Sequence, residues 1–225
     1  MSHHIDHPRS LEVEATFFGK VMMYFSLAVI ISAAGVFVSS QYFMSFFAAN
    51  PALIYVLYAV ELGLIFTSHF WSTKTPLNRI LFAAFAFITG VTISPLIVQL
   101  TATAAGTVLV YKALGITGLM FSATAIFGSI TKINLSGLRG FLLIALIGMI
   151  VTSVVGIFLP WGSTFEMLFS GFGVVLFSAF VAYDFQKIKH YPEDRYIDAA
   201  LNLYLDIFNL FLYILRFLTS LSGRD

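Results

Sequence analysis

Long apolar runs, each close to twenty residues, recur along the whole of this 225-residue chain. A helix needs about 20 consecutive apolar residues to cross the hydrocarbon core of a bilayer. Turn residues such as Asn50-Pro51 and Tyr191-Pro192 separate the runs. The pattern predicts an all-α membrane protein, a bundle of seven transmembrane helices at about 21–42, 52–71, 80–100, 107–130, 140–159, 165–185 and 197–221.

Composition supports lipid as the solvent for most of this surface. Apolar residues make up 59% of the chain and charged residues only 10%, against about 25% charged residues in a typical soluble protein. A water-soluble core of this size could not bury so much apolar surface. The net charge of +1 gives no global field for nucleic acid. We find no phosphate-binding loop, zinc helix or serine elbow, so the sequence predicts neither an enzyme nor a cofactor.

The short connections predict one domain. We expect a cytosolic N-terminal tail at residues 1–20, a transmembrane domain at 21–221 and a C-terminal tail at 222–225. The N-terminal segment lacks the basic start and the cleavage site of a signal peptide, so the first span should be permanent.

Basic residues predict the orientation. Loops at 43–51, 101–106 and 160–164 hold no Lys or Arg, whereas the tail and the loops on its side hold nine. The positive-inside rule therefore predicts a cytosolic N-terminus. Lys112, Arg216 and Arg224 fall outside this pattern. Because the last segment carries charge at both ends, a re-entrant helix that returns the C-terminus to the cytosol stays an alternative.

Three acidic residues lie within predicted spans. Asp206 is about nine residues into the last span, Asp184 lies near the cytosolic end of the sixth, and Glu61 is in the middle of the second. An ionisable residue in a span is by default a functional-site hypothesis. A hairpin around Tyr191-Pro192 would bring Asp184 and Asp206 to a similar depth. We expect Glu61 to be a pore or supporting polar residue, or to be satisfied by Asn or Ser contacts alone.

Asp206 belongs to a polar stripe formed with Asn202, Asn209 and Tyr213, at offsets of four, three and four residues. The other faces of this helix are Leu, Ile and Phe. Such a stripe should face other helices or a water-filled cavity, which predicts a central, polar-striped C-terminal helix.

Two carboxylates close together in a low-dielectric site cannot both ionise cheaply, so Asp184 and Asp206 should share a proton and titrate as one unit. Deprotonated, they offer hard oxygen ligands suited to Ca²⁺, so proton and metal would compete for one site. Alternatively, Asp184 is an interfacial charge paired with Lys187, and Asp206 is a hydrogen-bonded packing residue.

Other features favour structural roles. Pro95 should kink the third span. Two glycine pairs, Gly171 with Gly173 and Gly115 with Gly118, should permit close approach of helices.

Two C-terminal segments resemble a known signature. The run Ala-Tyr-Asp-Phe-Gln-Lys-Ile-Lys at 182–189, followed by Ala-Leu-Asn-Leu-Tyr-Leu-Asp-Ile-Phe-Asn-Leu-Phe at 200–211, is similar to the motif of the Bax-inhibitor family, particularly of its bacterial members. Glu61 in the second span and the Gly90-x-x-x-Ser94-Pro95 run in the third extend the resemblance.

The resemblance implies a calcium-leak channel that responds to pH, and its bacterial members imply a location in the inner membrane of a bacterium. In the family, two aspartates in the last two spans act as the proton sensor of the gate, and these positions match Asp184 and Asp206. The family fold also places the last helix at the centre of the other six. Some bacterial members have an arginine near the cytosolic end of the second span that engages the aspartates. This chain has none there, and Lys74 or His69 could take its place.

Two other functions stay open. One is a regulatory membrane protein that binds a protease or stress-response partner without conducting ions. The other is an intramembrane aspartyl protease, but the Gly-x-Gly-Asp context of that class is absent, because Asp206 follows Leu203-Tyr204-Leu205.

Overall fold

The fold is entirely helical in the part of the chain that the computed structural model describes, residues 11–223. The elements in chain order are α1 (Leu11–Tyr42), α2 (Met44–Ala49), α3 (Ala52–Phe66), α4 (Ser68–Trp71), α5 (Leu77–Thr101), α6 (Ala104–Ile130), the 3₁₀ turn η1 (Leu135–Leu138), α7 (Arg139–Phe158), α8 (Ser163–Lys187), the 3₁₀ turns η2 (Ile188–His190) and η3 (Glu193–Arg195), and α9 (Tyr196–Leu221).

Six of the described helices are long and apolar enough to cross a membrane, and α3 is a shorter apolar helix of 15 residues. The predicted second span therefore divides. After Phe66 the chain makes a turn at Thr67, whose hydroxyl donates to the Gly63 carbonyl at 2.6 Å, and α4 then continues to Trp71. The Thr67 backbone, with φ −91° and ψ 0°, departs from helical values, and hydropathy alone does not reveal this break.

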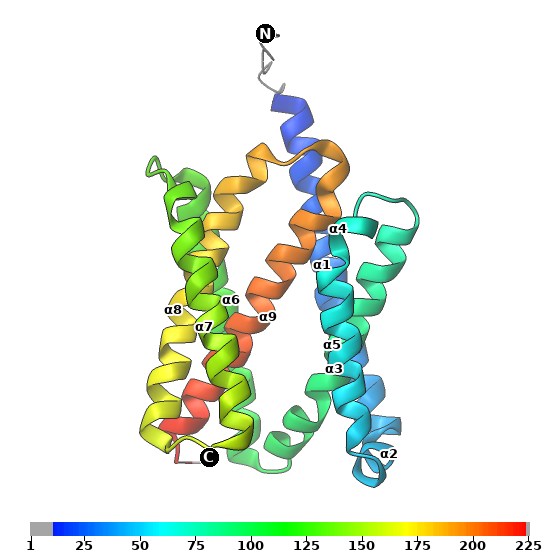
Figure 1. Ribbon diagram of the computed structural model, residues 1–225, viewed down its shortest axis with the longest axis vertical. Coiled ribbons are helices and arrows are strands. Elements are labelled where there is room, and N and C mark those ends of the chain that lie inside the picture. The colour runs from blue at the N-terminus through cyan, green and yellow to red at the C-terminus, as the bar shows by residue number, and fades with distance from the viewer. Residues whose placement is uncertain (1–10, 224–225) are drawn as a thin grey trace.

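The first helix is longer than predicted, since α1 begins at Leu11, within the segment expected to be a tail. The last helix, α9, is continuous from Tyr196 to Leu221. It begins near the end of the bundle where α1 begins and finishes at the opposite end (Figure 1). No re-entrant turn occurs within it.

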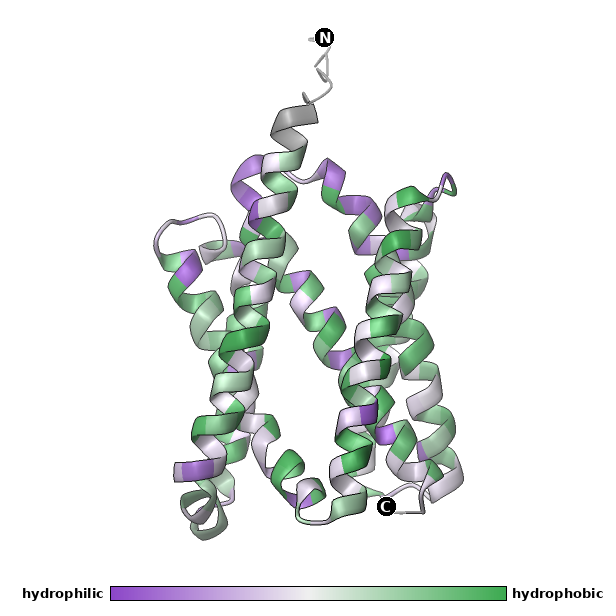
Figure 2. Cartoon of the chain, turned by 180° about the vertical axis from the view of Figure 1, so that it is seen from behind, coloured by the Kyte–Doolittle hydropathy of each residue, from purple (hydrophilic) through white to green (hydrophobic). Residues whose placement is uncertain are grey.

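Two packed groups make up the bundle, one around α1 and α5 and the other around α6 and α8. Helix α9 packs on α8, α6, α1 and α5, and it runs obliquely between the two groups (Figure 1). Helix α7 contacts mainly α8, and only Leu142 and Met149 of its residues are buried. The outward faces are rich in exposed Phe, Ile, Leu and Val, as a surface in contact with lipid requires. In the cartoon of Figure 2 most helical residues are hydrophobic, and hydrophilic residues gather near the end where α1 begins and on the first half of α9.

Helices α1 and α5 approach each other closely at two glycines. A Cβ added at Gly90 would meet the backbone of Ser32, and one at Gly35 would meet the carbonyl oxygen of Phe87. Gly173 likewise leaves room for the Tyr213 ring. The expectation for Gly115 and Gly118 was wrong, because nothing lies within 4 Å of a Cβ added at either position.

Pro95 lies inside α5 as expected. Proline has no N–H to donate to the carbonyl four residues earlier, here that of Val91. The neighbouring Ser94 hydroxyl supplies a donor instead, at 2.7 Å from the Val91 oxygen, and it also lies 2.6 Å from the Ser39 hydroxyl of α1. The Val91 carbonyl therefore has a hydrogen-bond donor within the bundle despite the proline.

Candidate functional site

Two aspartates meet in the interior of the bundle. Asp184, near the end of α8, is 6% exposed, and Asp206, within α9, is 5% exposed. Their side chains hydrogen-bond to each other. Such a bond requires one carboxyl group to carry a proton and donate it to the other. The Oδ2 atom of Asp206 is buried and has no other hydrogen-bond partner. We call these two residues the aspartate pair.

The connection between α8 and α9 places the pair. After Lys187 the chain tightens into η2, turns at Tyr191-Pro192, and passes through η3 into α9. Backbone bonds from Tyr191 to Ile188 and from Arg195 to Pro192 hold this compact hairpin. The two helices run antiparallel and in close contact (Figure 1). Asp184 lies three residues before the end of α8, and Asp206 lies ten residues after the start of α9.

The cation that acts on Asp184 is Lys187, one turn later on the same helix. Its ammonium group lies over the rings of Tyr183 and Tyr191. The two expected substitutes for the missing arginine, His69 and Lys74, are exposed, and neither bonds to the aspartate pair within the described structure. From the sequence, Lys187 was considered only in the alternative interpretation, in which it pairs with Asp184 as an interfacial charge and the aspartate has no functional role.

The polar stripe of α9 makes different contacts at each position. The Asn202 amide donates to the Tyr191 hydroxyl at 2.8 Å, and the Asn209 amide donates to the carbonyl of Leu205 at 2.8 Å in its own helix. The Tyr213 ring stacks on Phe177 of α8, with 5.5 Å between ring centroids. The stripe therefore faces α8 and the α8–α9 connection over most of its length.

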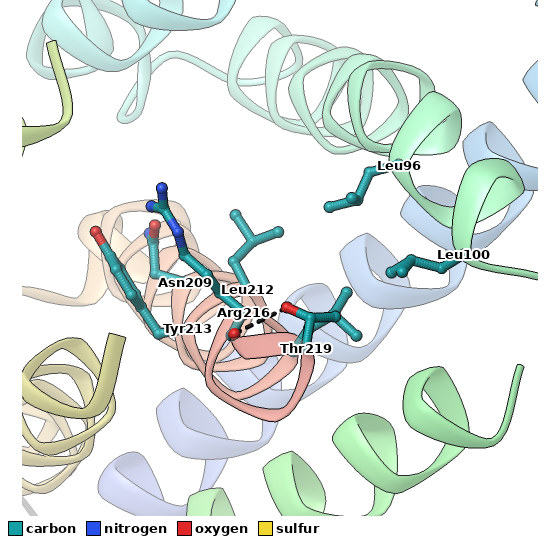
Figure 3. Close-up of a pocket in the computed structure, with 8 residues that line it drawn as sticks. Leu96, Leu100, Asn209, Leu212, Tyr213, Arg216 and Thr219 are labelled. Atoms are coloured by element: carbon teal, nitrogen blue, oxygen red, sulfur yellow. Dashed lines mark hydrogen bonds between the residues drawn. The ribbon is translucent and has the colours of Figure 1, made fainter. Parts of the chain in front are cut away.

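Beyond the pair, the stripe leads into a pocket of about 310 Å³ between α5 and α9. Figure 3 shows Asn209, Tyr213 and Arg216 on α9, with Leu96 and Leu100 of α5 across from them. Its lining residues are Leu96, Leu100, Asn209, Leu212, Tyr213, Leu215, Arg216 and Thr219.

Arg216 forms an ion pair with Glu166, in the first turn of α8, with 2.7 Å between Nε and Oε2. This ion pair was not predicted from the sequence. The available signal was that Arg216 departs from the charge pattern of the loops, and that Glu166 follows the turn at residues 160–162 on the same side of the bundle.

Glu61 lies apart from the aspartate pair. Its Oε1 accepts a hydrogen bond from the Thr92 hydroxyl at 2.9 Å, so it ties α3 to α5. The partner is a threonine, neither of the residue types expected. Within the described residues, no group of three or more His, Cys, Asp or Glu side chains could hold a metal ion, so the pair is a two-carboxylate site without a third acidic ligand.

Comparison with known proteins gives the family. A family model described as "Inhibitor of apoptosis-promoting Bax1" matches residues 14–223. An uncharacterized protein of Campylobacter jejuni is 30% identical, over 97% of each chain. Mouse "Protein lifeguard 4" is 30% identical over 96% of this chain and 89% of its own. Fission yeast "Bax inhibitor 1" is 29% identical over 85% of this chain and 70% of its own. The apolar helices and these matches together show that the chain is a multi-pass membrane protein that belongs to the Bax inhibitor family.

Proposed function

We propose that this chain is a pH-sensitive calcium (cation) leak channel gated by the aspartate pair. The observation that carries the proposal is a hydrogen bond between two buried carboxyl groups on adjacent helices, Asp184 and Asp206. When the shared proton leaves, two like charges face each other, and α8 and α9 repel. The pair thus converts a change in proton concentration into a force between two helices.

The same pair suits Ca²⁺ as a permeant ion. Two carboxylates supply at most four oxygens, whereas Ca²⁺ takes 6–8, so water completes the shell. Conduction requires binding weak enough for the ion to leave, and a site of two carboxylates without a third acidic ligand meets that requirement. Protons and Ca²⁺ then compete for the same oxygens.

The rest of the path follows α9, which we propose as the central helix because it packs on α8, α6, α1 and α5. Asn209 and Tyr213 lie along α9 between Asp206 and Arg216, and both line the pocket. Glu61, through Thr92, supports the neighbouring α3–α5 contact.

We propose seven crossings, with α3 and α4 forming the second. Helix α3 alone is about 22 Å long at 1.5 Å per residue, short of the roughly 30 Å hydrocarbon core. Residues 52–71 together reach about 30 Å, and they run from the α2 end to the end where α5 begins (Figure 1). The basic residues then place the N-terminus in the cytosol, and the bacterial relative favours a bacterial inner membrane.

The test is Ca²⁺ entry into liposomes that contain the purified full-length protein. We expect entry above that of protein-free liposomes, with a rate that changes over an acid-to-neutral pH series, because the shared proton controls the gate. The measurement is the fluorescence of a trapped calcium dye. Entry no faster than in protein-free liposomes at every pH would contradict the proposal.

A non-conducting regulatory role is the second candidate. Two relatives are named "Bax inhibitor 1" and "Golgi anti-apoptotic protein", and neither name refers to transport. A protease or stress-response protein in the membrane would then be the partner. The discriminating result is a variant with both aspartates changed to Asn that loses flux and yet keeps the phenotype of the intact gene.

We propose no enzymatic activity and no cofactor. The aspartate pair satisfies the first requirement of an intramembrane aspartyl protease, two adjacent carboxyl groups. However, Leu203 and Leu205 stand before Asp206 at the two positions where that class has glycine. An active-site-directed aspartyl protease inhibitor should therefore not bind.

A further inference from the structure

Lys187 is held beside the aspartate pair by aromatic rings and makes no direct ion pair there. Its ammonium nitrogen lies 4.7 Å from the centroid of the Tyr191 ring and 5.7 Å from that of Tyr183. Both distances fall within the roughly 6 Å range of a cation–π interaction. Because Lys187 follows Asp184 by three residues, both side chains lie on one face of α8, and the lysine charge acts on the carboxyl group.

The Tyr191 ring is itself fixed to the opposite helix. Tyr191 is buried, and its hydroxyl accepts a hydrogen bond from the Asn202 amide at 2.8 Å. Asn202 lies one turn before Asp206 on α9. The contacts therefore form a closed circuit, from Asp206 to Asp184, along α8 to Lys187, across to Tyr191, and back through Asn202 to α9.

Other charged groups near this circuit have partners of their own. The Lys189 ammonium donates to the Ser129 carbonyl at 3.1 Å. Asp198 pairs with Arg195 at 3.8 Å. The charge of Arg139 acts on the Tyr183 hydroxyl and is not among the charges that act on the aspartates. Within the described structure, Lys187 is the cation that acts on the pair.

We propose that Lys187, clamped by Tyr183 and Tyr191, is the fixed counter-cation of the aspartate pair. Its charge partly offsets that of the carboxylates, so it weakens the attraction of the pair for a mobile cation and sets the Ca²⁺ concentration at which the pair fills. This inference rests on the proposed function, since it assigns a residue that tunes cation affinity at the same site.

The experiment compares Lys187→Gln with Lys187→Arg and Lys189→Gln in the liposome assay. Removing the charge at residue 187 should lower the half-saturating Ca²⁺ concentration about threefold or more, because one repulsive charge leaves the site. Lys187→Arg keeps both the charge and the cation–π contact, so it should match the unmodified chain. Lys189→Gln removes the same charge from the same membrane face and should also leave the half-saturating concentration unchanged.

Substitutions at Tyr191 test the clamp separately from the lysine. Tyr191→Leu removes the ring face and should lower the half-saturating Ca²⁺ concentration in the same direction as Lys187→Gln. Tyr191→Phe keeps the ring, loses only the hydroxyl that accepts from Asn202, and should have a smaller effect. If Lys187→Gln fails to fold, the comparison of Leu with Phe at residue 191 still tests the clamp.

A second readout does not depend on conduction. Ca²⁺ that binds the folded protein raises its melting temperature in detergent, and Lys187→Gln should reach a given rise at a lower Ca²⁺ concentration. The inference is overturned if Lys187→Gln behaves like the unmodified chain in both assays, or if Lys189→Gln shifts the concentration equally. A flux assay in which the unmodified chain conducts nothing would instead contradict the proposed function.

Discussion

Asp206→Asn is expected to make Ca²⁺ flux independent of pH. An amide cannot lose the shared proton, so Asp184 never faces a second negative charge across the α8–α9 contact. Over an acid-to-neutral series, the variant should keep less than about a third of the change in flux that the unmodified chain shows, because the coupled titration no longer exists. Liposome flux at each pH, normalised to the amount of protein, measures this directly.

Asp198→Asn is the matched control. This aspartate lies on the same helix, but its partner is Arg195 and not a carboxyl group. Its neutralisation should leave the pH profile of the flux unchanged. A flattened profile in Asp198→Asn, or an unaltered profile in Asp206→Asn, would show that the aspartate pair is not the sensor.

Gly90→Ala is expected to destabilise the fold strongly. A Cβ at this position would meet the Ser32 carbonyl oxygen, with the Ser32 carbonyl carbon at 2.8 Å and the Val36 nitrogen at 3.0 Å. All three are backbone atoms, so α1 and α5 must move apart. Overpacking of this kind costs about 1–3 kcal/mol or more, and the melting temperature in detergent should fall by about 5 °C or more.

The control for this substitution is Gly118→Ala. Nothing lies within 4 Å of a Cβ added there, and alanine is the better helix former by up to about 1 kcal/mol. Its melting temperature should stay unchanged or rise slightly. Equal losses at Gly90 and Gly118 would mean that a general intolerance of glycine substitution, and not the α1–α5 contact, explains the effect.

The sequence predicts the helices because hydrocarbon thickness imposes one length on every span. The six long helices end within a few residues of the predicted runs at most boundaries. The departures have local causes. Residues 11–20 extend α1 because a helix can project beyond the lipid, and the break at Thr67 lies in the backbone angles of one residue. Neither feature changes the hydropathy of the run.

Contacts between helices are harder to predict, because they depend on which face of each helix meets its neighbour. Gly90 and Gly118 both have small residues nearby in the sequence, yet only Gly90 lies at a helix crossing. The aspartates were accessible to sequence reasoning because charge within a span is costly and needs a partner. The clamp on Lys187 could not be predicted from the sequence, because Tyr191 lies in a turn and reaches the site only through the hairpin.

The most direct test of the account is a double-mutant cycle on the aspartate pair. Flux is measured across the pH series for Asp184→Asn, Asp206→Asn and the double variant, with protein incorporation checked for each. If the two residues form one proton-sharing unit, either single change removes most of the pH dependence, and the double variant loses little more. Independent effects that add in the double variant would contradict the account, because two separate carboxyl groups would then be titrating.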